Sequence, residues 1–473
     1  MKNRSTGRGS RSLWLPFLLA ALTVACARSG AVSAETLNEA LASAYSGNPT
    51  LRAQRANQRA TDELVPQALA GWRPTVTAQA FSGVEHVDSH GIASQTVAAG
   101  GGANVSKTTI PGQVQITLSQ PIFSGFGPHY SLKSGEANVE ASRQNLLAVE
   151  QDILFQATQA FMNVIRDRQI LTLRQRNVVV LQEQLKAAQE RFNVGEVTRT
   201  DVAQAQARLA LSHSQVAAAQ ATLAASVASF VEIVGHSPGS LKYPKLAKLP
   251  PNLDGAVATA ERINPQVLAA AFVAEAAQND VGVARAGLLP SVSLQASALA
   301  QSPDLQQSAN EETYTILGVV TIPLYEAGRV YSAVRQAKQI ASQRRIEIIE
   351  VQRAVRDTVV TAWNALDSAR QVIVAAKSQV SADELALEGV KQEYLVGSRT
   401  TLDVLDAEAE LLLARETLVV AERDQVVAAY QLIASTGRLT ADDLGLAVKI
   451  YDPVENYRKV RNKWFGTHAN TVD

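Results

Sequence analysis

The sequence predicts a mainly α-helical protein with a smaller β-sheet portion, which several copies of the chain must complete. Three observations support this fold class. Two long stretches, 128–194 and 329–396, are almost free of Gly and Pro; short segments between helices alternate apolar with polar residues; and an internal repeat produces each feature twice. A helix as long as either stretch would span roughly 100 Å, too long for a compact globular domain.

Residues 1–34 have the pattern of a secretory signal peptide, which predicts export of the remainder. Its parts are a basic start, an apolar core and a small-residue cleavage site: Lys2, Arg4, Arg8 and Arg11; Leu13 to Ala25; and Val32, Ser33 and Ala34. A cut after Ala27 is an alternative, and lipidation of Cys26 is a weaker one.

Composition excludes several classes of protein. The 473 residues contain 44 basic and 44 acidic side chains, and removal of residues 1–34 leaves 39 basic against 44 acidic, so a nucleic-acid partner is not expected. With 6 His and 1 Cys, neither a metal site nor a cofactor is predicted. Beyond the N-terminus no run of about 18 uncharged apolar residues appears, which argues against a helical membrane protein.

The chain contains one structural unit written twice. Residues 189–235 align without a gap on 391–437, and further upstream Asn48-Pro49 corresponds to Asn264-Pro265. We therefore divide the chain into a signal peptide, two repeats and a C-terminal tail: 1–34, 35–250, 251–450 and 451–473.

Each repeat is expected to combine one long helix with two shorter ones. Apolar residues recur every seven positions along the long stretches, for example from Ala157 to Phe192 and from Val359 to Tyr394, which predicts coiled-coil packing. The shorter helices are predicted at 49–70, 198–234, 265–288 and 400–436.

Two hairpins, hence four strands, are predicted between the helices. Val114, Ile116 and Leu118 alternate with polar residues, and Val292 and Leu294 do the same in the second repeat. Thr75 to Val84 and Tyr314 to Ile322 supply the partner strands, and 86–106 and 300–312 are predicted as exposed loops. Four strands cannot close a barrel, so closure by identical copies would remove the open edges.

The sequence resembles the TolC family of outer-membrane channel-tunnels. The resemblance covers nearly the whole chain after the signal peptide and rests on the following motifs: Glu35-Thr36-Leu37, both Asn-Pro pairs, Gln120 to Phe123, Phe192 to Gly195, and the run from Tyr394 to Asp406. It implies a homotrimer in which each chain gives four strands to a twelve-stranded outer-membrane barrel and its helices to a long antiparallel coiled-coil tunnel in the periplasm. It also implies coupling to a periplasmic adaptor and an inner-membrane transporter, for drug efflux or type I secretion. The tail 451–473 is then expected to be a periplasmic extension.

Asp403 and Asp406 are the candidate aperture residues. They are three positions apart, so on a helix they share one face, and in a trimer they would form two rings of carboxylates that attract cations. The matching family positions line the narrow periplasmic entrance. Alternatively, Asp403 completes a capping box that begins at Thr400, as Asp201 does after Thr198; this alternative does not explain Asp406.

The resemblance assigns two further groups of residues, a latch and an adaptor contact, to the turns that follow the long helices. A latch that holds the entrance shut would pair Tyr394 with Asp201 and Arg399 with the region of Thr200; the alternative is a core tyrosine beside a solvated arginine. Contact with the adaptor is expected around the two turns, at Val194, Gly195, Val396, Gly397 and Ser398. Gly195 and Gly397 are also typical left-handed helix ends.

Two other functions are weighed against the duct. The first is an exported trimeric coiled-coil protein of structural or adhesive function. Such a protein would have a single stalk and head, whereas this sequence contains two sets of strands and long helices. A single-chain porin needs about eight strands or more and has no use for the rods. The sequence contains no phosphate-binding loop, nucleophile elbow or cysteine nucleophile beyond residue 34, so an enzyme is not expected.

Overall fold

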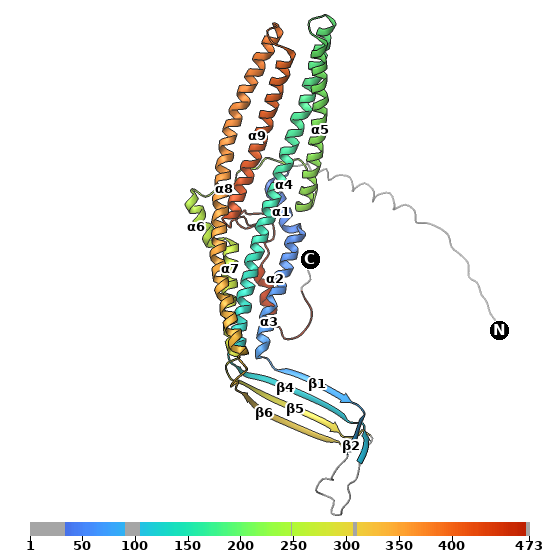
Figure 1. Ribbon diagram of the computed structural model, residues 1–473, viewed down its shortest axis with the longest axis vertical. Helices are drawn as coiled ribbons and strands as arrows, with labels where there is room; N and C mark the ends of the chain where they lie inside the picture. Colours follow the sequence, from blue (N-terminus) through green and yellow to red (C-terminus); the bar gives the residue numbers. More distant parts are fainter. Residues whose placement is uncertain (1–33, 90–104, 247, 306–309, 470–473) are drawn as a thin grey trace, which may run out of the picture.

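The computed structural model describes residues 34–89, 105–246, 248–305 and 310–469; the predicted signal peptide, including Cys26, lies outside them. The chain is elongated: long helices run side by side, and a β-sheet continues from one end of them at an angle (Figure 1). The two helical hairpins have their turns at the far end, opposite the sheet.

The order helix, helix, two strands of the main sheet, long helix, helix occurs twice, and the first half also contains α3, η1, β2 and β3. The first half contains α1 (Leu37–Gly47), α2 (Pro49–Asp62), α3 (Leu64–Leu69), the short 3₁₀ helix η1 (Ala70–Trp72), β1 (Thr75–Ser82), β2 (Glu85–Ser89), β3 (Val105–Thr109), β4 (Gly112–Ser124), α4 (Gly127–Asn193) and α5 (Arg199–Val234). The second contains α6 (Leu253–Ile263), α7 (Pro265–Ala286), β5 (Ser291–Ser302), β6 (Glu311–Thr321), α8 (Arg329–Leu395), α9 (Thr401–Ser435) and the tail helix α10 (Pro453–Val460). The repeat bounds 35–250 and 251–450 remain a prediction.

The long helices match the expected rods. Both α4 and α8 have 67 residues, which corresponds to about 100 Å each. The seven-residue seam is buried in the middle of α4, where Ala157 and Val164 are fully covered. Toward the hairpin end the buried positions become Leu181 and Ala188 instead of the predicted Val178 and Phe192. A straight helix drifts by about 20° per heptad, so one strict register cannot face the same neighbour throughout.

The Asn-Pro pairs end one helix and begin the next. Asn48 accepts hydrogen bonds from the backbone N–H groups at the start of α2, while its side-chain amide donates to the carbonyl of Ile233 at the end of α5, 3.1 Å away. Asn264 does the same in the second repeat and donates to Ser435 of α9 at 2.9 Å. Each Asn therefore ties the start of a helix to the C-terminal end of α5 or α9, which is the end of the hairpin opposite its turn.

The four-stranded sheet is antiparallel, in the order β1-β4-β5-β6, and has two chemically different faces. The register places Ala78, Ile116, Ala298 and Tyr314 in one row across the sheet. Neighbouring rows of this face are also mostly apolar, whereas the opposite face carries Thr, Ser and Gln on the central strands. Ile316 is 75% exposed, so the apolar face is uncovered in one chain.

Two details of the strand region differ from the sequence prediction. Part of the predicted loop 86–106 forms a second, two-stranded sheet from β2 and β3; its short, polar strands escape a search for apolar alternation. The strand β4 also continues past the alternating residues Val114 to Leu118 and includes Pro121, where the register with β5 shifts. A bulge tolerates proline because its missing N–H is not needed there.

Two hydrophobic clusters hold the middle of the molecule. One joins α1, α4, α5 and α9 around Leu154, Phe161 and Phe230, and the other joins α6, α8 and α9. Two helical stretches, Arg199–Val234 and Leu253–Ala286, are long and apolar enough to cross a membrane by length and composition. In the fold α5 and α7 both pack along α4, but only 11% and 33% of the most apolar windows in the two stretches are buried within one chain.

Two helical glycines should respond oppositely to alanine. A Cβ at Gly282 of α7 would lie 2.3 Å from Cγ of Tyr130 on α4, whereas nothing lies within 4 Å of one at Gly389. We expect Gly282→Ala to destabilise the protein by about 1–3 kcal/mol through overpacking. Gly389→Ala should stabilise α8 by about 1 kcal/mol. Thermal unfolding midpoints measure both, and a rise for Gly282→Ala would contradict this packing.

Candidate functional site at the hairpin ends

The turns between α4 and α5 and between α8 and α9 have the same backbone conformation. Gly195 and Gly397 have φ angles of 84° and 82°, in the left-handed region. A side chain would meet nothing within 4 Å at either position, so conformation rather than space requires glycine. The adjacent Val194 and Val396 are 72% and 80% exposed, which leaves two apolar tips uncovered in one chain.

Capping boxes begin the helix after each turn. Asp201 accepts hydrogen bonds from the backbone N–H and hydroxyl of Thr198, and Asp403 accepts the same pair from Thr400, at 2.8 Å each. The backbone hydrogen bond and then the hydroxyl of Thr400 lower the pKa of Asp403, which therefore stays ionised. The capping alternative holds for Asp403, whether or not it also lines a pore.

The predicted latch residues lie at these turns and have nearby partners within one chain. The hydroxyl oxygens of Tyr394 and Thr401 are 3.3 Å apart, and the guanidinium of Arg191 lies 4.4 Å from the centre of the Tyr394 ring. Arg399 donates to Glu393 at 2.7 Å. Thr200 is exposed in the first turn of α5. Pairing of Tyr394 with Asp201, and of Arg399 with the region of Thr200, stays a prediction.

Asp406 is held by a residue that sequence analysis did not identify. Arg208 of α5 donates from Nη2 to Oδ1 of Asp406 on α9, at 2.7 Å. The two side chains are 40% and 52% exposed, so water screens the pair and its expected contribution is about 0.2–1 kcal/mol. It nevertheless joins the first hairpin to the second close to their ends, next to the candidate aperture.

A small hydrophobic cluster supports this ion pair. Leu405, beside Asp406, is 2% exposed and packs against Leu181 and Ala188 of α4 and Ala205 of α5. A groove of about 150 Å³ lies next to it, and its lining includes Arg208, Leu405 and Glu416. Apolar packing thus brings α9 against both helices of the first hairpin where the charges meet.

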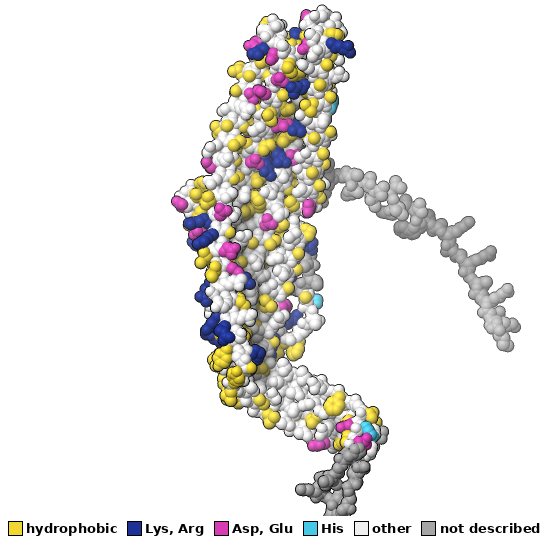
Figure 2. Space-filling view, viewed as in Figure 1, with side chains coloured by type: hydrophobic (Ala, Val, Ile, Leu, Met, Phe, Trp, Pro, Cys, Tyr) yellow, Lys and Arg dark blue, Asp and Glu magenta, His cyan; other side chains and the backbone are white. Residues whose placement is uncertain are grey.

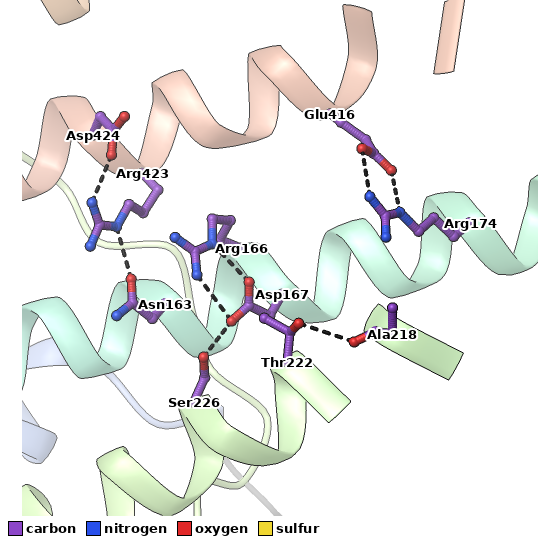
Figure 3. Close-up of polar contacts among 10 residues, drawn as sticks. All are labelled: Asn163, Arg166, Asp167, Arg174, Ala218, Thr222, Ser226, Glu416, Arg423 and Asp424. Atoms are coloured by element: carbon purple, nitrogen blue, oxygen red, sulfur yellow. Dashed lines mark hydrogen bonds and ion pairs between the residues drawn. The ribbon is translucent and has the colours of Figure 1, made fainter. Parts of the chain in front are cut away.

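Further ties between the hairpins follow α9 toward the middle of the molecule (Figure 3). Arg174 of α4 makes two hydrogen bonds to Glu416, at 2.6 and 3.1 Å. Arg423 donates to Asn163 of α4 at 2.9 Å. Glu416 and Arg423 are seven residues apart, which keeps both on the face of α9 toward α4; Asp406, ten residues before Glu416, is rotated by about 80° from it and contacts α5 instead.

A buried carboxylate links α4 to α5 in the same region. Asp167 is 4% exposed, accepts from the neighbouring Arg166 at 2.7 Å, and accepts a hydrogen bond from Ser226 (Figure 3). Basic and acidic side chains intermix along the hairpins in the space-filling view (Figure 2). Within the described part of the chain, no group of three or more His, Cys, Asp or Glu residues could hold a metal ion.

Comparison with known proteins identifies the class of this fold. The family model described as outer membrane efflux protein matches residues 40–236 and 257–438. Outer membrane efflux protein BepC of Brucella suis is 38% identical over 445 residues, which cover 92% of each chain. Outer membrane protein TolC of Escherichia coli is 25% identical over 87% of this chain and 84% of its own.

Solved structures agree at the level of the fold. The CmeC outer membrane channel of Campylobacter jejuni superposes with a TM-score of 0.75 at 17% identity, covering 90% of this chain and 89% of its own. The protein therefore belongs to the outer membrane efflux protein family and is an outer-membrane protein. Its helices and sheet form the channel-tunnel fold expected from the resemblance.

The sequence located the hairpin ends but not the contacts between hairpins. Arg208, Arg174 and Glu416 carry no local motif, and their partners lie 198 or 242 residues away. The seven-residue spacing of Glu416 and Arg423 places both on one face of α9. It would have indicated contacts with α4 only if the face of α9 toward α4 had been known.

The ion pair between Arg208 and Asp406 can be tested by exchanging its charges. Arg208→Asp or Asp406→Arg alone should loosen the entrance and raise closed-state conductance in planar bilayers, because each places like charges together. The variant with both substitutions should return toward the parent conductance.

Arg415 and Glu384 provide a matched control. They are also 2.7 Å apart and similarly exposed, at 43% and 51%, but they join α8 to α9 inside one hairpin. Reversing their charges should leave conductance unchanged. If the double variant with exchanged charges at Arg208 and Asp406 conducts as much as the single variant of higher conductance, the ion pair does not restrain the entrance.

Proposed function

We propose that the chain forms a homotrimeric channel-tunnel that acts as the passive exit duct of a tripartite efflux pump, a type I secretion system, or both. Three four-stranded sheets would close a twelve-stranded barrel in outer-membrane lipid, and the helices would form the periplasmic tunnel. A periplasmic adaptor and an inner-membrane transporter would open the entrance and supply energy. The duct carries out no chemical reaction and is not an enzyme.

The observation that carries this proposal is the combination of the sheet and the hairpins in one chain. The sheet has an apolar and a polar face and two strands, β1 and β6, at its edges. Lipid outside and water inside a barrel require this alternation, and closure satisfies the backbone groups at the edges. The hairpins extend far from the sheet, as a tunnel wall must (Figure 1).

The relatives support both kinds of transport. One is named an alkaline protease secretion protein, AprF of Pseudomonas aeruginosa, 25% identical over 70% of each chain. Another is named an antibiotic efflux pump outer membrane protein, ArpC of Pseudomonas putida, 23% identical over 54% of this chain. Relatives with both kinds of name are similar in sequence to this one chain. We therefore assign the choice of cargo to the transporter. The adhesive coiled-coil alternative does not account for the two-faced sheet.

In this duct the entrance is narrowed by Asp403 and Asp406, latched by Tyr394, Arg399, Thr200 and Asp201, and contacted by the adaptor at the exposed tips. The adaptor assignment is supported by the uncovered apolar side chains of Val194 and Val396. Val194 precedes Gly195 in one turn, and Val396 precedes Gly397 and Ser398 in the other. Helical tips with such side chains suit docking against another helical hairpin.

The carboxylate rings predict cation selectivity. The double variant Asp403→Asn, Asp406→Asn should lose selectivity for cations and block by divalent cations in single-channel recordings, because it removes the fixed negative charge. Arg208→Gln is the control: it breaks the same ion pair but keeps both carboxylates, so selectivity should persist. Unchanged selectivity in the double aspartate variant would refute the aperture assignment.

The latch predicts an independent effect on opening. Tyr394→Phe combined with Arg399→Ser removes a hydroxyl and a guanidinium from the turn but leaves Asp403 and Asp406 in place. Closed-state conductance should rise while cation selectivity stays the same. Conductance equal to the parent would mean that these residues only shape the turn.

A further inference from the structure

The C-terminal tail is fixed along the helices, starting beside α1. The backbone N–H of Tyr451 donates to the hydroxyl of Tyr45, 3.0 Å away. The guanidinium of Arg55, on α2, lies 4.5 Å from the ring centre of Tyr45 and 5.3 Å from that of Tyr451. Aromatic and cationic contacts therefore hold the start of the tail against α1 and α2.

Buried polar contacts hold the tail helix α10 further along. Asn456 is 8% exposed and donates to Asp62 at 2.9 Å, while Gln58 donates to the other oxygen of Asp62 at 3.0 Å. Burial raises the pKa of Asp62, although both hydrogen bonds favour its ionised form. Arg461 of the tail contacts Glu136 of α4 at 3.1 Å. These pairs position α10 against both α2 and α4.

The end of the tail reaches the junction between helices and sheet. Arg73 donates from Nη1 to the carbonyl of Lys463 at 2.9 Å, and its guanidinium lies 4.7 Å from the centre of the Trp464 ring. Arg73 stands two residues before β1 begins at Thr75. The tail thus places Trp464, and Phe465 after it, where the strands leave the helices.

Both aromatic side chains are uncovered there. Trp464 is 57% and Phe465 87% exposed, and their ring centres are 6.4 Å apart. Other exposed apolar side chains occur where strands and helices meet in sequence: Trp72, Ile122, Phe126, Leu324 and Tyr325. Because the guanidinium of Arg73, the residue after Trp72, lies over the Trp464 ring, the tail aromatics lie beside the first of these junctions.

We propose that Trp464 and Phe465 insert into the headgroup region of the phospholipid leaflet that faces the periplasm, so that the tail anchors the tunnel to the membrane surface. The proposal rests on the proposed function in one respect, that the sheet is the part in lipid. Amphipathic aromatic rings favour the membrane–water interface, and barrels carry aromatic girdles there. Lys463, which directly precedes Trp464, is exposed; its ammonium also donates to the carbonyl of His468, and it suits phosphate groups.

Quenching of tryptophan fluorescence by lipid tests this anchor. The assembled protein, with Trp464 as its only tryptophan (Trp14, Trp72 and Trp363 replaced by Phe), is placed in vesicles of phosphatidylcholine brominated near the headgroup end of its acyl chains. Its fluorescence should fall by roughly half relative to unbrominated vesicles, as expected for an interfacial indole.

The control is a chain whose only tryptophan comes from Tyr243→Trp. Tyr243 is 42% exposed and hydrogen-bonded to α9 at Glu422, in the segment between α5 and α6 and away from the sheet. Brominated lipid should leave this tryptophan unquenched. If the single-tryptophan chains do not assemble, the same comparison uses the otherwise native chain and its Trp464→Phe variant, whose difference in quenching reports Trp464.

The outcomes separate the anchor from other occupants of this surface and from failure of the duct itself. Trp464 that is unquenched by lipid but quenched by acrylamide lies in water, which overturns the anchor. Trp464 protected from both is covered by protein, such as a second copy of the chain, which also overturns it. The variant Ile316→Trp, with its tryptophan in the apolar face of the sheet, serves as the reference: if this tryptophan also escapes the lipid quencher, the sheet is not in the membrane.

Discussion

The structure depends on one constraint: the backbone groups at the edges of a four-stranded sheet must find partners. β1 and β6 each have one neighbour in the chain, and within lipid no water can replace the missing hydrogen bonds. The apolar face of the sheet adds a second reason for closure, because it is uncovered in one chain while the opposite face is polar. A ring of identical chains satisfies both requirements, and the helices that leave the sheet must then form a ring as well.

The helical part is held together differently, by many weak contacts along its length. Hydrophobic clusters at the middle join both repeats through α9, whereas near the hairpin ends the contact narrows to Leu405, its few neighbours and the ion pair of Arg208 with Asp406. Weak, partly exposed contacts suit the entrance proposed for these hairpin ends, because little free energy would be needed to break them. Strong packing in the middle keeps the rest of the wall intact.

The sequence was sufficient for most features that periodicity and local chemistry determine. It predicted the rods within a residue or two, the alternating strands and the turns at Gly195 and Gly397, and it offered the capping box at Asp403 as an alternative to the aperture. It missed the short helices α1 and α6. It could not provide contacts between segments far apart: Arg208 with Asp406, Arg73 with Trp464, or Asn456 with Asp62. Such pairs depend on which helix faces meet, and that choice follows from the packing of the whole chain. The β2–β3 sheet was missed because its strands lack an apolar face.

The central claim is that identical chains close the sheet, and the mass of the assembly extracted from outer membranes in mild detergent tests it most directly. Native mass spectrometry should give three times the mass of the processed chain, and heating should reduce it to one. An assembly that contains a single chain, with its two sheet edges unpaired, would contradict the account.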